Sequence, residues 1–217
     1  MRNEWNAITQ WPDFAKSLVV NAEKAGVFTT GIESDKKQRG SSINCDLYGY
    51  EPYSGLAVVQ VRQCQFRPGR YNKVRKDYYL LGMSDNGELF AHPVETPARS
   101  KKALETPEAT VKWVLGKIWD CKPDELPLIK RQGDIAFIPS PLPAGSIEVE
   151  NCVTLRQTHK ITGRIMKAPD GRLYVERATA KHTKWQHATV KTPKGAWFRI
   201  QEGIRAKAWG FTRPKGD

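Results

Sequence analysis

Three of the four histidines in the chain fall within one stretch, which runs from residue 159 to residue 211. His159, His182 and His187 share this stretch with twelve lysines and arginines and with three tryptophans. Imidazole changes its charge near neutral pH and also binds metal ions, so clustered histidines can carry acid/base or metal chemistry. The basic and aromatic neighbours favour a phosphate-rich partner for the same stretch.

Metal-independent acid/base catalysis is one alternative for these histidines. A neutral imidazole can deprotonate a hydroxyl and an imidazolium can protonate a leaving group, which together can cleave RNA through its own 2′-hydroxyl. Lys184 or Lys160 would then stabilise charge on the phosphoryl oxygens. The spacing of five residues between His182 and His187 places them on opposite faces of a regular strand, so this alternative requires a bend or a bulge.

A catalytic zinc site is another alternative, because three imidazoles leave a fourth coordination position open. The sequence contains no helical H-E-x-x-H motif, and acidic residues near the cluster are scarce, with Asp170 and Glu176 the nearest in sequence. The surrounding positive charge opposes a divalent cation. From the sequence we therefore assign no metal site and expect no cofactor.

The net charge of +12 is concentrated in the second half of the chain. Residues 1–127 hold 18 basic and 16 acidic side chains, whereas residues 128–217 hold 17 basic and 7 acidic ones. This excess indicates a polyanionic partner, with a basic face kept only for solubility as the alternative. RNA, single-stranded or structured, is favoured over DNA, because we find no helix-turn-helix or zinc finger to enter a major groove.

The predicted nucleic-acid-binding residues lie in two segments, and we expect them to bind RNA without cleaving it. A protein-interaction or structural module, with incidental charge, is the remaining alternative. The C-terminal half supplies phosphate-binding cations and stacking rings, namely Lys160, Arg164, Arg172, Tyr174, Lys181, Lys184, Trp185, Lys191, Lys194, Trp197 and Arg199. A basic turn supplies Arg67, Arg70, Lys73, Arg75 and Lys76.

The four cysteines, Cys45, Cys64, Cys121 and Cys152, form no C-x-x-C pair, which argues against a zinc ribbon or a dithiol redox motif. We expect free buried thiols. Residues 1–14 lack the apolar core of a signal peptide, and no run approaches the ~18 apolar residues that a membrane span needs. The sequence therefore predicts a cytoplasmic protein with no membrane partner.

Apolar spacing predicts two helices in the first half of the chain, over residues 12–25 and 106–119. Gly26 is placed to end the first helix, and Thr106 is placed to cap the second. Other patterns in this half predict a strand over residues 56–66, a β-hairpin over 78–92 and a polar loop over 33–44.

The second half of the chain reads as almost wholly β. Short runs separated by Gly and Pro turns predict a small barrel or a curved antiparallel sheet rather than a parallel βαβ unit. The predicted strands cover residues 134–138, 146–155, 160–166, 172–177, 188–191, 196–201 and 205–211.

A segment rich in proline and charge, over residues 121–132, indicates a boundary between two domains. The predicted class is therefore α+β, with an N-terminal domain of residues 1–127 that contains two helices and a β-hairpin. A basic, β-rich domain of residues 128–217 follows it.

Overall fold

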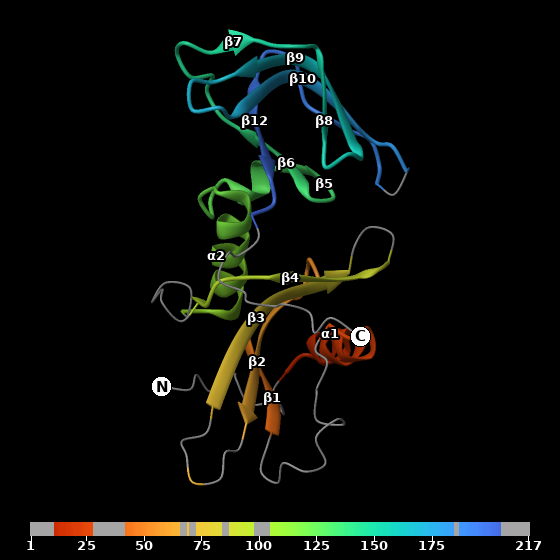
Figure 1. Ribbon diagram of the computed structural model, residues 1–217, viewed down its shortest axis with the longest axis vertical. Coiled ribbons are helices and arrows are strands. Elements are labelled where there is room, and N and C mark those ends of the chain that lie inside the picture. The colour runs from red at the N-terminus through yellow and green to blue at the C-terminus, as the bar shows by residue number, and fades with distance from the viewer. Residues whose placement is uncertain are drawn as a thin grey trace. The chain divides into compact units, whose positions relative to one another are not determined.

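The computed structural model describes residues 11–27, 42–65, 69, 73–83, 87–97, 105–184 and 187–204 (Figure 1). The chain divides into two compact units, and the division falls between Val114 and Leu115, inside a helix. The described part of the first unit precedes that point, and the second unit spans Leu115–Ile204. Both units contain antiparallel sheet, so the α+β class is confirmed. The boundary between residues 127 and 128 stays a prediction about which fragment folds alone.

The first unit is built on a four-stranded antiparallel sheet in the order β1-β2-β3-β4. The hairpin predicted over residues 78–92 is present as β3 and β4, but it belongs to this larger sheet. Strand β1 was missed, because the polar residues at its start continue the pattern of the predicted loop 33–44. The strands are β1 (Ser42–Glu51), β2 (Leu56–Gln65), β3 (Lys73–Met83) and β4 (Leu89–Pro93).

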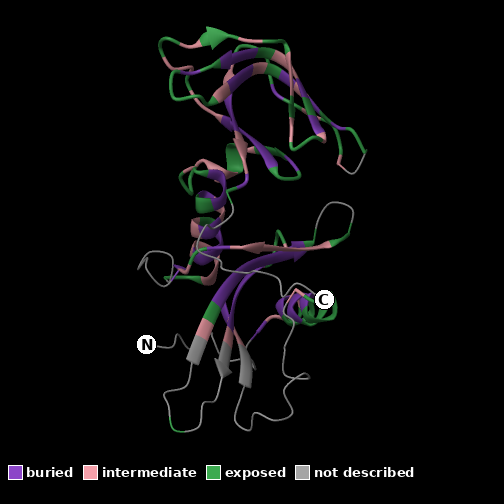
Figure 2. Ribbon diagram, viewed as in Figure 1, coloured by how far each residue is buried: buried purple, intermediate pink, exposed green. Residues whose placement is uncertain are grey.

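Helix α1 (Asp13–Lys24) packs its apolar stripe against this sheet, as the spacing predicted. Leu18 and Ala22 lie in one buried cluster with Val59 and Leu81 of the strands. The helix ends at Lys24, and Gly26 beyond its C-cap has a φ of 71°, the left-handed conformation that glycine adopts most easily at a helix C-terminus. Figure 2 shows the buried residues of α1 and of the strands in purple.

Helix α2 (Pro107–Trp119) begins at the predicted cap, since the Thr106 hydroxyl accepts the Ala109 N–H at 3.1 Å. Its first turn approaches β1 so closely that a Cβ on Gly49 would overlap the side chain of Thr110. Only glycine fits at that position of β1. Neither α1 nor α2 is long and apolar enough to cross a membrane.

The second unit is built on an eight-stranded antiparallel sheet. Its main path is β5-β6-β12-β10-β9-β7, with β11 paired to β10 and β8 paired to β9. In the part of the chain described, the end strands β5 and β7 do not pair with each other, so the sheet is open and the predicted barrel is not closed. The strands are β5 (Lys130–Gln132), β6 (Ile135–Pro139), β7 (Ile147–Glu148), β8 (Cys152–Leu155), β9 (His159–Lys167), β10 (Leu173–His182), β11 (Val190–Lys191) and β12 (Trp197–Glu202), preceded by the 3₁₀ helix η5 (Leu126–Leu128).

Alternate residues of these strands form the core of the second unit, which Figure 2 shows as purple bands along β6, β9 and β10. Phe137, Ile161, Ile165 and Val175 are fully buried in it. Two predicted strands need correction: the run 146–155 is two strands, β7 and β8, and the run 172–177 continues to His182. The predicted strand 205–211 lies outside the described residues.

Candidate functional site

The three histidines of the C-terminal stretch come together in the second unit. His159 begins β9 and His182 ends β10, and the two residues are directly opposite each other across the antiparallel pair. Residues opposite each other in such a pair point to the same face of the sheet. His187 follows β10 in the connection to β11, so the chain leaves the strand, as the spacing required. One ring nitrogen of each histidine lies within 4.8 Å of the others.

A β-bulge sets the register that brings the two strand histidines together. Strand β10 contains one residue more than β9 between the pairs Glu176–Arg164 and Thr179–Thr162. Without the extra residue, the strand ends would slip by one position and the two histidines would point to opposite faces. Gly163 of β9 lies opposite the bulge, where a Cβ would lie 2.9 Å from the Glu176 carbonyl oxygen. A local irregularity therefore builds the cluster.

The three rings are packed closely and mostly buried. His159 is 3% exposed and His182 is 5% exposed, whereas His187 is half-buried. The His159 and His182 rings are perpendicular with centroids 4.7 Å apart, and the His182 and His187 rings are perpendicular at 5.1 Å. The His159 and His187 rings are nearly parallel at 6.1 Å. A molecule as large as RNA cannot reach the rings of His159 and His182 unless the ends of β9 and β10 separate.

The environment of the two strand histidines favours their neutral forms. Burial lowers the pKa of His159, and His182 and His187 lower it further, against the opposing effects of the Asp134 carboxylate and of the Gln132 backbone. Burial also lowers the pKa of His182, as do the nearby His187 and the ammonium of Lys184. Neutral imidazoles offer lone pairs, so this is the protonation state in which nitrogen can bind a metal ion.

Hydrogen bonds orient the strand histidines. The Thr158 hydroxyl lies 3.2 Å from His159 Nδ1 and 3.2 Å from the Arg156 carbonyl oxygen. The backbone N–H of Lys184 donates to His182 Nδ1 at 3.2 Å. Two ring nitrogens, His159 Nε2 and His187 Nδ1, are buried and have no hydrogen-bond partner. Unpartnered buried nitrogens are unusual and call for a physical explanation.

The turn between β5 and β6 contributes three residues that the sequence did not reveal. Gln132 is 1% exposed and donates to the carbonyl oxygens of Ala180 and Ala188 at 3.0 and 2.7 Å, which ties the turn to both sides of the histidine segment. Asp134 Oδ1 lies 3.6 Å from His159 Nε2. A Cβ on Gly133 would lie 2.6 Å from His187 Nε2. No local sequence pattern connects this turn with histidines so far along the chain.

The hairpin turn next to His159 has a strained backbone. Arg156 and Gln157 both have positive φ values, 51° and 61°, although neither is glycine. Arg156 is held by ion pairs with Asp134 and Glu202. Strain of this kind persists where the surrounding structure fixes it, and it is frequent at functional sites. The turn therefore holds Thr158 and His159 in defined positions.

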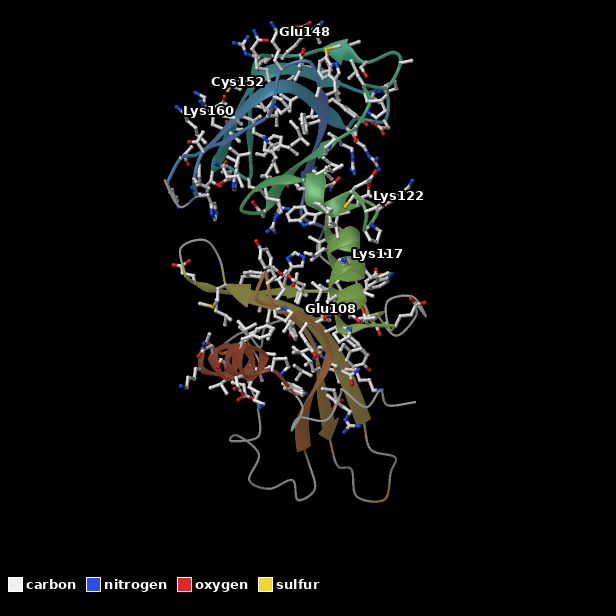
Figure 3. All side chains as sticks on the ribbon, turned by 180° about the vertical axis from the view of Figure 1, so that it is seen from behind. Glu108, Lys117, Lys122, Glu148, Cys152 and Lys160 are labelled. Carbon is white, nitrogen blue, oxygen red and sulfur yellow. The ribbon has the colours of Figure 1, made fainter. Side chains whose placement is uncertain are left out.

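A second feature of this unit is a basic face on the side of the sheet opposite the core. Cross-strand pairing places Lys160 beside Lys181, and Lys191 beside Thr179 in the next row. Arg164 lies on the same side of β9, four residues beyond Lys160, and all four basic residues are exposed. We call Lys160, Arg164, Lys181 and Lys191 the basic face; Figure 3 labels Lys160 on it.

An open depression of about 590 Å³ adjoins the basic face, above the β-bulge. Its lining includes Arg164, Arg177 and Lys194 together with Glu148 and Glu176. Arg164 Nε lies 3.4 Å from the exposed Glu148 carboxylate, so part of the positive charge of this surface is offset by an ion pair. Among the described residues, Lys160, Lys181 and Lys191 form no ion pair.

Several other predicted nucleic-acid-binding residues have structural contacts instead. Tyr174 is 6% exposed and packs in an apolar cluster, so its ring offers no stacking face. Arg199 is 7% exposed and binds Asp120. Arg172 also binds Asp120, at 3.2 Å, and Trp197 is half-buried with the Arg164 guanidinium 5.6 Å from its ring centroid. Lys184 is exposed beside His182.

The predicted basic turn in the first unit is only partly described. Lys73, Arg75 and Lys76 belong to strand β3 rather than to a turn. Arg75 forms an ion pair with the buried Asp77 at 3.0 Å, whereas Lys76 is exposed. The predicted residues Arg67, Arg70 and Trp185 lie outside the described residues.

The site as a whole combines a buried triad of imidazoles with an exposed basic face on one sheet. A search of protein-family models, of curated proteins and of solved structures finds no match to this chain.

Proposed function

We propose that the second unit binds nucleic acid, with single-stranded or structured RNA favoured over DNA, across the basic face. The observation that carries the proposal is the in-register pair of Lys160 and Lys181, with Lys191 in the adjoining row. Among the described residues, none of these three lysines forms an ion pair. Three exposed cations in neighbouring rows can follow successive phosphates and release their counterions on binding.

Binding without cleavage fits the burial of the histidines. An RNA that lies on the basic face would have to bring a 2′-hydroxyl to imidazoles that are 3% and 5% exposed. General acid/base catalysis needs direct hydrogen-bond reach or one bridging water. His159 and His182 therefore serve poorly as the acid and base of an RNA-cleaving enzyme.

A cytoplasmic location belongs to the same proposal. Cys45, Cys121 and Cys152 are free, half-buried thiols, which is the usual state of cysteine in a reducing compartment.

Salt-dependent binding of a fluorescent single-stranded RNA tests the proposal on the full chain. Lys160→Gln combined with Lys181→Gln should reduce the slope of log Kd against log salt by about 1.4, because each phosphate contact to a single strand contributes about 0.7. Fluorescence anisotropy across a range of salt concentrations gives the slope. A DNA of the same length should bind more weakly.

Lys122→Gln combined with Lys167→Gln is the matched control, since both lysines are exposed and lie off the basic face. This control removes the same charge and should leave the slope within the error of the wild type. An equal fall in both double variants would mean that only total charge attracts RNA, and salt-independent binding would exclude phosphate contacts altogether.

A further inference from the structure

The proposed binding of RNA does not use the buried histidine triad, and the arrangement of its ring nitrogens points to a second site. We propose that His159, His182 and His187 bind one divalent transition-metal ion of the zinc class, with Asp134 beside it. The proposal rests on the convergence of three ring nitrogens within 4.8 Å and on two buried nitrogens that lack a partner.

The Thr158 hydroxyl is placed to hold His159 in the tautomer that metal binding needs. A hydroxyl has one proton, and the Thr158 hydroxyl donates that proton to the Arg156 carbonyl oxygen at 3.2 Å. In the tautomer that carries its proton on Nδ1, His159 donates this proton to the Thr158 oxygen, which lies 3.2 Å away. This leaves a lone pair on His159 Nε2, which is buried and has no hydrogen-bond partner. A metal-binding histidine is usually held in this way by its other nitrogen.

His187 and His182 differ in the hydrogen bonds that their ring nitrogens would have to give up to bind an ion. His187 Nδ1 is buried without a partner, and its loop position allows the ring to adjust. His182 Nδ1 accepts the Lys184 N–H, so its neutral ring carries the proton on Nε2. Coordination through His182 Nε2 requires the other tautomer of this ring, with the proton on Nδ1 instead of Nε2. The Lys184 N–H must then turn away from Nδ1, which no longer accepts it. One long hydrogen bond is lost while three metal–nitrogen bonds form.

The distances are close to those of a coordination site. Tetrahedral zinc with nitrogen ligands at 2.0–2.1 Å holds these nitrogens about 3.3 Å apart, so the triad must contract by roughly 1.5 Å at most. Gly133 makes room for this contraction, because a side chain there would enter the space beside His187 Nε2 and His159 Nε2.

The ligand chemistry selects the class of ion. Neutral imidazoles bind Zn²⁺, Co²⁺, Ni²⁺ and Cu²⁺, whereas Mg²⁺ and Ca²⁺ prefer oxygen ligands. The Asp134 carboxylate, 3.6 Å from His159 Nε2, supplies negative charge that the sequence did not place near the triad. It offsets the opposing charge of Lys184.

Titration of the chelator-treated full chain with Co²⁺ tests the site directly. We expect one Co²⁺ per chain, with the visible absorption of a four-coordinate nitrogen site, and displacement by equimolar Zn²⁺ but not by Mg²⁺. His187→Gln should weaken Co²⁺ binding by roughly 100-fold or more, and Asp134→Asn by about 10-fold. His187 is half-buried, so this variant keeps the buried pair intact.

His92→Gln is the matched control, since it removes the one histidine outside the triad, on β4 in the first unit. It should leave the stoichiometry and the spectrum unchanged. Zinc should also raise the Tm of the wild type and not that of His187→Gln. A wild type without saturable Co²⁺ binding at micromolar concentrations, or an unchanged spectrum in His187→Gln, would overturn the proposal even if RNA binding stands.

Discussion

At the scale of single residues, Arg199 shows that the contacts of a cation decide its role. Its sequence neighbourhood predicted phosphate binding, yet the residue is 7% exposed, and its guanidinium lies 3.3 Å from the Asp120 carboxylate and 2.6 Å from the Asp120 carbonyl oxygen. Asp120 has a φ of 50°, a left-handed conformation that Asp and Asn tolerate better than most residues. The pair fixes the end of α2 to β12 inside the second unit.

Asp120→Asn should therefore lower the free energy of unfolding by about 2 kcal/mol, the usual contribution of a hydrogen bond to a charged group. Asparagine keeps the shape and the backbone preference, so the change isolates the charge. Urea unfolding measures the effect, and Asp124→Asn at an exposed position is the control, with an expected change within about 0.5 kcal/mol. Equal changes in both variants would mean that the Asp120 backbone carbonyl and the Gln201 side chain hold Arg199 without the Asp120 carboxylate.

Residue type alone was enough to find the three histidines, but it could not find their surroundings. His159, His182 and His187 stand out because histidine is rare in the chain and three of four are close in sequence. Asp134 and Gly133 reach the triad only through the pairing of β5 with β6 and the hydrogen bonds of Gln132. The spacing of residues along the sequence does not reveal contacts between segments so far apart.

At the scale of elements, the bulge in β9 and β10 controls whether a cluster exists. Gly163→Ala should place a Cβ 2.9 Å from both the Glu176 carbonyl oxygen and Val175 Cγ2. Relief of this overlap requires the bulge to open, so we expect a loss of about 2 kcal/mol in unfolding free energy. The imidazole signals of the triad should shift in nuclear magnetic resonance spectra, because the register beyond the bulge is disturbed.

Gly203→Ala is the matched control for this substitution. The nearest atoms to a Cβ at Gly203 lie 3.6 Å away, which is ordinary van der Waals contact. The control should change the free energy of unfolding by no more than about 0.5 kcal/mol. It should also leave the imidazole signals of the triad unchanged. If Gly163→Ala behaves like this control, the backbone at the bulge accommodates a side chain and the register does not depend on glycine.

Elements with a strong local period were predicted well, and those without one were not. The helices α1 and α2 and the hairpin of β3 and β4 follow from apolar spacing, capping and turn residues. Strand β1 was missed, because Asn44 and Asp46 interrupt any apolar alternation and its stability comes from pairing with β2. The closure of a barrel depends on which strands end the sheet, which no single run of sequence encodes.

At the scale of the whole molecule, the excess positive charge of the second half is only partly available to a partner. Arg172 and Arg199 share the carboxylate of Asp120, Arg172 also pairs with Asp170, and Arg164 pairs with Glu148. The lysines of the basic face lack such partners among the described residues. Net charge therefore indicates the class of partner, whereas ion pairs within the fold decide which cations can bind it.

The same contacts predict where the second unit can be separated. A fragment of residues 115–204 keeps Trp119, which is 5% exposed and lies against Gly203 and the Arg131 guanidinium. It also keeps the hydrogen bond from the Ile204 N–H to the Ile118 carbonyl oxygen. A fragment of residues 128–204, cut at the boundary that the sequence predicts, loses these contacts and leaves Arg199 without Asp120.

We therefore expect the fragment 115–204 to unfold cooperatively and the fragment 128–204 to be less stable by about 3 kcal/mol or more, from lost apolar burial and an unpaired buried cation. Circular dichroism during urea unfolding measures both. Trp119→Ala within the longer fragment should reproduce part of the loss, which separates the effect of the side chain from that of chain length. Equal stability of the two fragments would instead place the boundary at residue 128 and leave residues 115–127 as a linker.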